Sequence, residues 1–257
     1  MIDIRPIQRS EADLFLSLLC DVFELDRARA QSIFFAEPLF DLQRKWALFE
    51  DGQMLSILTT VPLEFGWGRA IGIAGVATIP DRQRQGFAGQ LMLRVLRDSQ
   101  DQGEGHVMLF AHDTRLYQRL GFKVLDEVIR GPIDADIEKD VPQSLDFDQV
   151  KELYDSWAAG DASRLRRDGQ RWKYWRWNLR ICSPFSEGYL CFEGGIVREV
   201  VVRKPAKQWE LPPDTEWLGL TSMAERLQVP LRSTTSDLKL MGYKVPALPQ
   251  FYMTDQF

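Results

Sequence analysis

Gln83-Arg84-Gln85-Gly86-Phe87-Ala88-Gly89 is the stretch that decides the fold of this chain. It follows an apolar, strand-like run (residues 71–79) and opens a run with helical spacing (residues 90–97). Its two glycines permit a tight turn because they carry no Cβ atom. A turn that leads into a helix N-terminus presents several free N–H groups beside the positive end of the helix dipole. The stretch therefore predicts a site for a phosphate or pyrophosphate group.

Two common phosphate-binding motifs are absent from this turn. The dinucleotide fingerprint requires three glycines in the order G-x-G-x-x-G, and the two glycines here do not have that spacing. A phosphate-binding loop that ends in Gly-Lys-Ser or Gly-Lys-Thr is also missing. On this segment alone, an ordinary turn between a strand and a helix remains an alternative.

A second segment, Tyr117-Gln118-Arg119-Leu120-Gly121-Phe122, follows after the helix-like run and a short apolar strand (residues 106–110). With both segments in place, the chain resembles the GNAT N-acetyltransferase superfamily over roughly residues 1–130. The coenzyme A loop of that family has the pattern Arg/Gln-x-x-Gly-x-Gly/Ala, which residues 83–88 match. Its later motif, Tyr-x-x-x-Gly-Phe, is matched by residues 117–122.

The resemblance implies an α/β fold with a mixed α+β sheet, acetyl-CoA as co-substrate and no metal. It implies that the acetyl group moves to a primary amine by direct transfer in a ternary complex. The loop N–H groups would bind the pyrophosphate, and the preceding strand would splay from its neighbour and pair with the pantetheine arm. An N–H near Val76 or Ala77 would polarise the thioester carbonyl. The implied cofactor-binding residues are Val76, Ala77, Thr78, Gln83, Arg84, Gln85, Gly86, Phe87, Ala88 and Gly89.

Tyr117 is the predicted general acid. A phenol of pKa about 10 is protonated at neutral pH and can donate to a thiolate of pKa about 8.5. The alternative is a tyrosine that packs a helix against the sheet. The general base stays open among Glu64, His106 and His112, each of which has a surface or structural role as its alternative.

The chain is predicted to hold two domains: a catalytic GNAT domain that binds acetyl-CoA (residues 1–133) and a degenerate GNAT-like domain that shapes the acceptor site (residues 134–257). An acidic run with two prolines (residues 131–142) is the expected connection. Leu120-Gly121-Phe122-Lys123-Val124 recurs as Met241-Gly242-Tyr243-Lys244-Val245, and a strand is expected to begin at each glycine. The second copy lacks the loop motif and has Leu238 in place of Tyr117, so it is not expected to hold coenzyme A or to catalyse.

Tandem copies of which only the first is active resemble the enhanced-intracellular-survival acetyltransferases. Those proteins usually carry a further sterol-carrier-like domain, for which this chain is too short, so their substrates and oligomeric state are not carried over. In that subset the terminal carboxylate reaches the active site. The last residues here (251–257) are rich in aromatic side chains, which makes Phe257 a second candidate catalytic residue. A free terminus is the alternative.

The composition is that of a globular protein, with 257 residues of which 45% are hydrophobic and 27% charged. A net charge of −5 argues against general nucleic-acid affinity and is compatible with a cationic acceptor. The three cysteines lack the spacing of a metal site or a disulfide framework. The absence of a signal peptide and of a long apolar run predicts a cytoplasmic location and no membrane partner.

Residues 164–180 combine seven Lys and Arg side chains with four aromatic ones, a pattern that also occurs in proteins that bind single-stranded nucleic acid. The favoured interpretation is a helix with Trp172, Trp175 and Leu179 in a buried stripe and the cations on the solvent side. Two alternatives to the enzyme therefore remain: a nucleic-acid-binding protein and a non-catalytic acyl-CoA sensor. The acceptor, a small molecule or a peptide, stays open, as does a homo-oligomer.

Overall fold

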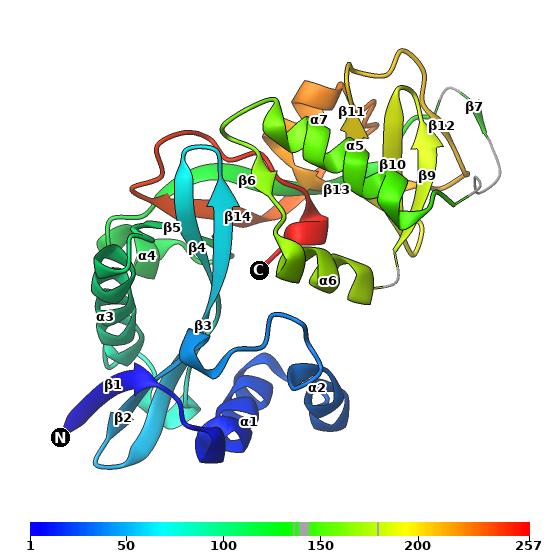
Figure 1. The fold of residues 1–257 in the computed structure, drawn as a ribbon. Helices are drawn as coiled ribbons and strands as arrows, with labels where there is room; N and C mark the ends of the chain where they lie inside the picture. The colour runs from blue at the N-terminus through cyan, green and yellow to red at the C-terminus, as the bar shows by residue number, and fades with distance from the viewer. Residues whose placement is uncertain (136, 139–143, 179) are drawn as a thin grey trace.

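Most strands of the protein join one mixed sheet, described here from a computed structural model of residues 1–135, 137–138, 144–178 and 180–257 (Figure 1). The first half contains β1 (Ile2–Pro6), α1 (Ala12–Phe23), α2 (Arg27–Phe34), β2 (Lys45–Glu50), β3 (Gln53–Phe65), β4 (Gly68–Thr78), α3 (Phe87–Asp101), β5 (His106–Ala111), α4 (Arg115–Arg119) and β6 (Lys123–Pro132). The second half contains β7 (Ile137–Glu138), α5 (Phe147–Ala159), β8 (Leu165–Arg166), α6 (Gly169–Trp177), β9 (Ile181–Phe185), β10 (Gly188–Glu193), β11 (Ile196–Val202), β12 (Glu210–Leu211), β13 (Glu216–Leu220), α7 (Thr221–Leu227) and β14 (Thr235–Tyr243). Short 3-10 helices are η1 (Arg9–Glu11), η2 (Leu42–Arg44), η3 (Pro80–Arg82) and η4 (Met253–Asp255).

The strand order confirms the predicted mixed sheet and reveals an exchange of strands between the halves. The order is β1-β2-β3-β4-β5-β14-β6-β13-β11-β10-β9, and β8 pairs with β3. Strand β14, from the end of the chain, lies between β5 and β6 and is antiparallel to both. Strand β6 in turn pairs with β13 of the second half. Each half therefore supplies a strand that completes the sheet of the other.

The two halves repeat the same topology. In the first half β4 and β5 are parallel, and α4 leads from β5 to β6. In the second half β11 and β13 are parallel, and α7 leads from β13 to β14. The tandem GNAT-like arrangement is thus present in the sheet. The connection from β11 to β13 contains β12 but no counterpart of α3, and all of its residues (203–215) are described.

The five-residue echo that suggested the repeat does not mark equivalent positions. Gly121 precedes β6 with φ of 90°, whereas Gly242 lies at the end of β14 rather than at the start of a strand. Met241 pairs with Val124, so the two segments are neighbours in the sheet. The expected strand led by Gly242 was wrong because this glycine serves a close approach and not a turn. A Cβ atom there would lie 2.4 Å from Leu125 Cδ1.

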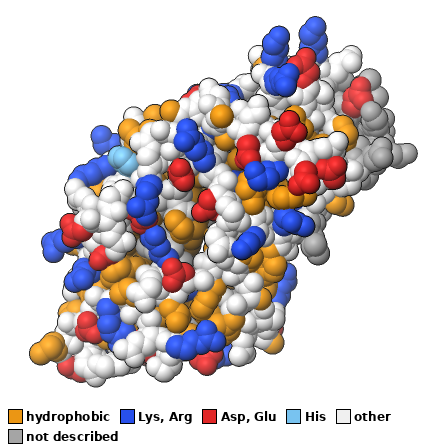
Figure 2. Space-filling model, in the orientation of Figure 1, with side chains coloured by type: hydrophobic (Ala, Val, Ile, Leu, Met, Phe, Trp, Pro, Cys, Tyr) orange, Lys and Arg blue, Asp and Glu red, His pale blue; other side chains and the backbone are white. Residues whose placement is uncertain are grey.

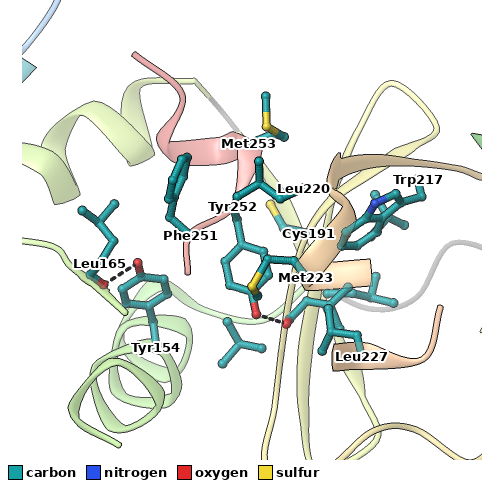
Figure 3. Close-up of a cluster of buried hydrophobic side chains, with 14 of the residues drawn as sticks. Tyr154, Leu165, Cys191, Trp217, Leu220, Met223, Leu227, Phe251, Tyr252 and Met253 are labelled. Atoms are coloured by element: carbon teal, nitrogen blue, oxygen red, sulfur yellow. Dashed lines mark hydrogen bonds between the residues drawn. The ribbon is translucent and has the colours of Figure 1, made fainter. Parts of the chain in front are cut away.

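Three apolar clusters flank the sheet. One lies under α3 and contains Leu91 and Val95, and another lies under α1 and contains Phe15. The largest fills the second half, where Trp217, Tyr252 and Met223 pack together (Figure 3). The predicted connection at residues 131–142 begins inside the sheet, because β6 extends to Pro132. Residues 136 and 139–143 lie outside the described part of the chain. No described helix is long and apolar enough to cross a bilayer.

Candidate active site

The predicted phosphate-binding stretch forms a turn between β4 and α3. The 3-10 helix η3 ends at Arg82, and Arg84 and Gly86 then adopt the left-handed conformation with φ of 62° and 86°. Gly86 is the N-cap residue of α3. Two side chains brace this turn: Gln83 donates to the carbonyl of Thr78 at 3.2 Å, and Arg82 pairs with Glu50 at 2.6 Å.

The N–H groups of this turn are available to a ligand. Among the described residues, no protein acceptor receives a hydrogen bond from the backbone N–H of residues 84–89, and residues 83–86 are exposed. Helix α3 is 15 residues long, so the positive end of its dipole adds to the field at the same place. A row of unpaired donors at a helix N-terminus fits the pyrophosphate of coenzyme A.

Strand β4 separates from β5 beside this turn. The two strands pair only from Ala70 to Ile73, whereas β4 continues to pair with β3 as far as Thr78. The carbonyl of Ala77 accepts from the Ser56 hydroxyl at 2.8 Å and therefore faces β3. Because N–H groups alternate along a strand, those of Val76 and Thr78 point toward the gap. The open edge is the place where an extended ligand can add as a strand.

Tyr117 lies on α4 at the α3 side of the sheet. Its half-buried ring packs against Phe122, with 6.1 Å between centroids, and belongs to the cluster that also includes Val76. Burial raises the pKa of the phenol, and the nearby Asp113 carboxylate raises it further. The phenol is therefore protonated at neutral pH. Its hydroxyl makes no hydrogen bond to any described residue, which leaves its proton available for donation.

Phe257 lies against the other face of the open strand. A Cβ atom at Gly72 would come within 2.3 Å of the Phe257 ring, so the ring needs glycine at that position. The ring also packs on Phe110, with 5.2 Å between centroids. Next to it is a cavity of about 230 Å³, which we call the α2 cavity. Its lining consists of Leu19, Phe34, Glu37, Leu39, Lys45, Thr59, Val61, Ala74, Gly75, Tyr174, Gln256 and Phe257.

Buried ion pairs hold the chain segment that leads to Phe257. Arg167 is fully enclosed and contacts the carboxylates of Glu199, at 2.6 Å, and Asp255, at 2.7 Å. Arg171 donates to the Asp255 carbonyl, and the C-terminus lies beside α6 (Figure 1). Burial opposes the charge of Glu199, yet Arg167 and several hydrogen bonds hold the pKa of that carboxyl below its ordinary value.

The arginine-rich stretch therefore has a structural task, and one expectation about it was wrong. Trp172 and Trp175 are buried as expected, while Leu179 lies outside the described residues. Arg167 and Arg171 were expected on the solvent side but are also buried, because the C-terminal segment brings acceptors to them. They are not available to phosphates of a nucleic acid. On the face drawn in Figure 2, acidic and basic side chains are interspersed.

None of the three candidate bases lines the α2 cavity. Glu64 is exposed on β3 and lines a different cavity. His106 stands at the paired end of β5, with Nδ1 2.5 Å from the Lys244 carbonyl. His112 follows β5 and lines a third cavity with Gln256.

Sequence reasoning missed Glu37 and Lys45, which the fold brings into the α2 cavity from the end of α2 and the start of β2. Burial raises the pKa of Glu37, and Lys45 acts in the opposite direction. Neither residue stands in a recognisable motif, so no local signal could have found them.

Comparisons with known proteins agree with this geometry. Residues 3–125 match the family model described as an acetyltransferase (GNAT) domain. The match places a GNAT acetyltransferase domain at residues 3–125. Acetyl-CoA is the co-substrate of that family, and the domain is an acyltransferase. No curated protein matches the sequence.

Solved structures extend the likeness to the second half. A GCN5-related N-acetyltransferase of Anabaena variabilis is 17% identical, with a TM-score of 0.70, over 94% of this chain and 72% of that one. A GCN5-related N-acetyltransferase of Kribbella flavida is 17% identical, with a TM-score of 0.69, over 94% and 70%. Eis1 of Mycobacterium abscessus is 15% identical, with a TM-score of 0.60, over 93% and 73%. At these identities the likeness establishes the fold, and it covers both halves of the chain.

Proposed function

We propose that the protein transfers the acetyl group of acetyl-CoA to a primary amine by direct transfer in a ternary complex. Residues 1–133 would hold coenzyme A, and residues 134–257 would shape the acceptor site. The observation that carries the proposal is the row of unpaired N–H groups at residues 84–89 next to the open edge of β4. Both features are needed to hold a long ligand that bears a diphosphate at one end.

Residues of the turn, of β4 and of α4 would each carry one part of the reaction. The turn from Gln83 to Gly89 binds the diphosphate, and the open edge of β4 orients the pantetheine arm. Of the two predicted donors to the thioester carbonyl, Val76 is the better placed, since Ala77 faces β3. Tyr117 donates the proton that the departing thiolate takes up. The reaction then needs a base that accepts a proton from the acceptor amine.

Glu37 and Phe257 are the two candidates for this base among the residues that line the α2 cavity. A carboxylate whose pKa is raised by burial is a better base near neutral pH than an ordinary one. The carboxylate carried by Phe257 stays a prediction, and a chain extended by one glycine would move it away. Replacing Glu37 with Gln should remove the acidic limb of the kcat/KM profile if Glu37 is the base. An unchanged limb would leave the role to Phe257.

The test of the proposal is turnover of acetyl-CoA, followed by thiol release, against a panel of primary amines. A Tyr117→Phe variant should lose about 10²- to 10⁴-fold in kcat, the contribution expected of a general acid. Tyr243→Phe is the matched control, because Tyr243 packs in the same cluster, 5.6 Å from Phe122. Equal rates in both variants would remove Tyr117 from its role. Coenzyme A binding without turnover of any amine would favour the acyl-CoA sensor.

A further inference from the structure

Lys45 is the most unusual charged residue of the α2 cavity. Only 5% of the residue is exposed, yet the cavity reaches its side chain. Its Nζ lies 4.9 Å from the centre of the Phe34 ring and 5.5 Å from that of Phe40. Among the described residues, no carboxylate oxygen comes within 4.0 Å of this Nζ, and no acceptor takes a hydrogen bond from it.

Burial without hydrogen bonds is costly for an ammonium group, which has three N–H donors to satisfy. Desolvation lowers the pKa of Lys45, while Glu37 and Asp41 raise it from beyond contact distance. The Asp41 carboxylate already accepts from the N–H of Gln43 at 2.9 Å. The described residues therefore surround the Lys45 amine with an aromatic wall and with two carboxylates beyond contact distance, but they offer it no direct partner.

The cavity presents the opposite charge as well. Glu37 has no ion pair within the described residues, and its carboxylate lines the same space. The apolar part of the lining includes Leu19, Leu39 and Val61. A cavity lined by a cationic side chain, an acidic side chain and apolar surface is complementary to a small molecule that carries both charges on an aliphatic body.

We propose that Lys45 binds a carboxylate of the substrate in the α2 cavity, so that the acceptor is an amino acid or a compound built like one. The amino end of such an acceptor would face Glu37 and the open edge of β4. This inference rests on the proposed function, because it names the class of acceptor for that reaction. The same carboxylate could instead end the acyl chain of a dicarboxylic acyl-CoA, and the experiment separates these two sources.

Binding is measured first, without turnover. Calorimetry on the protein with coenzyme A compares N-acetyl-leucine with N-(3-methylbutyl)acetamide, which differ only in the carboxylate. Wild-type protein should prefer N-acetyl-leucine. Lys45→Met keeps the apolar stem and should weaken that ligand about 10- to 100-fold, the usual range for one charge-assisted hydrogen bond, with no effect on the amide. Lys45→Arg should retain most of the preference.

Turnover then locates the carboxylate. Leucine is compared with 3-methylbutylamine as acceptor for acetyl-CoA, and succinyl-CoA is compared with butyryl-CoA as donor. A preference for leucine that is lost in Lys45→Met places the carboxylate on the acceptor, and a preference for succinyl-CoA places it on the acyl group. If wild-type protein favours the uncharged member of every pair, or if Lys45→Met weakens both members equally, the proposal is overturned. A binding preference without turnover of any amine on the panel would contradict the proposed reaction and still support the carboxylate site.

Discussion

The two parallel strand pairs of this protein have the same topology but differ in what occupies the gap between their strands. In the first half, β4 and β5 part after Ile73, and the edge of β4 stays open beside a turn with unpaired N–H groups. In the second half, β11 and β13 pair only at Ile196 and Val197 before they part. There the hydroxyl of Tyr252 donates to the carbonyl of Val200, and the Arg167 ion pairs lie alongside.

The gap between β11 and β13 is thus closed by other residues of the protein, whereas the gap between β4 and β5 is open to a ligand. The described connection from β11 to β13 (residues 203–215) also lacks a counterpart of α3, so no helix N-terminus lies there to bind a phosphate. The comparison teaches that strand topology alone does not make a coenzyme A site. In the proposed function the open edge, the turn and the helix act together, whereas the second half has a buried core that anchors Phe257.

The largest effect is expected at Arg167, whose ion pairs lie beside the closed gap between β11 and β13. Arg167→Met would leave Glu199 and Asp255 as buried carboxylates without their cation, at a cost of about 3–5 kcal/mol in the free energy of unfolding. Urea denaturation measures this. Arg176→Met, at an exposed position of α6, the helix that follows Arg167, should change stability by less than about 0.5 kcal/mol. Similar losses in both variants would mean that the ion pairs do not anchor the segment.

A smaller effect is expected at the open gap. Gly86→Val places a β-branched residue at a φ of 86°, and the strain, about 1–2 kcal/mol, should distort the turn and weaken coenzyme A binding about tenfold. Gly194→Val imposes similar strain on the hairpin between β10 and β11, where φ is 59°. It should reduce stability but leave the calorimetric affinity for coenzyme A unchanged. Weaker binding in the Gly194 variant would break the contrast between the halves.

The smallest effect is expected at Tyr252, and it tests why the second half is not expected to bind coenzyme A. Tyr252→Phe removes one buried hydrogen bond and should cost about 1 kcal/mol in stability. Calorimetry should still find one coenzyme A per chain, because the second half has no phosphate turn. A second equivalent of bound coenzyme A would show that Tyr252 alone keeps that gap shut.

Local patterns predicted much of the first half. The turn at residues 83–89 opens α3 as expected, with Gly86 at φ of 86°, and the strand expected at residues 106–110 is β5. These features follow from residues that lie next to each other in the chain, which is why their signal is readable. The exchange of β6 and β14 had no such signal, since a strand's partner is chosen by contacts between residues far apart in sequence.

The sequence by itself determined the turn from Gln83 to Gly89, the position of Tyr117 on the helix after β5, and the presence of a second, degenerate copy. Only the tertiary structure decided that Ala77 faces β3, that Arg167 and Arg171 are buried, and that Glu37 and Lys45 share a cavity with Phe257. The reason is physical: glycine conformations and helix starts are set by neighbouring residues, while burial and charge pairing are set by whichever distant segments pack together.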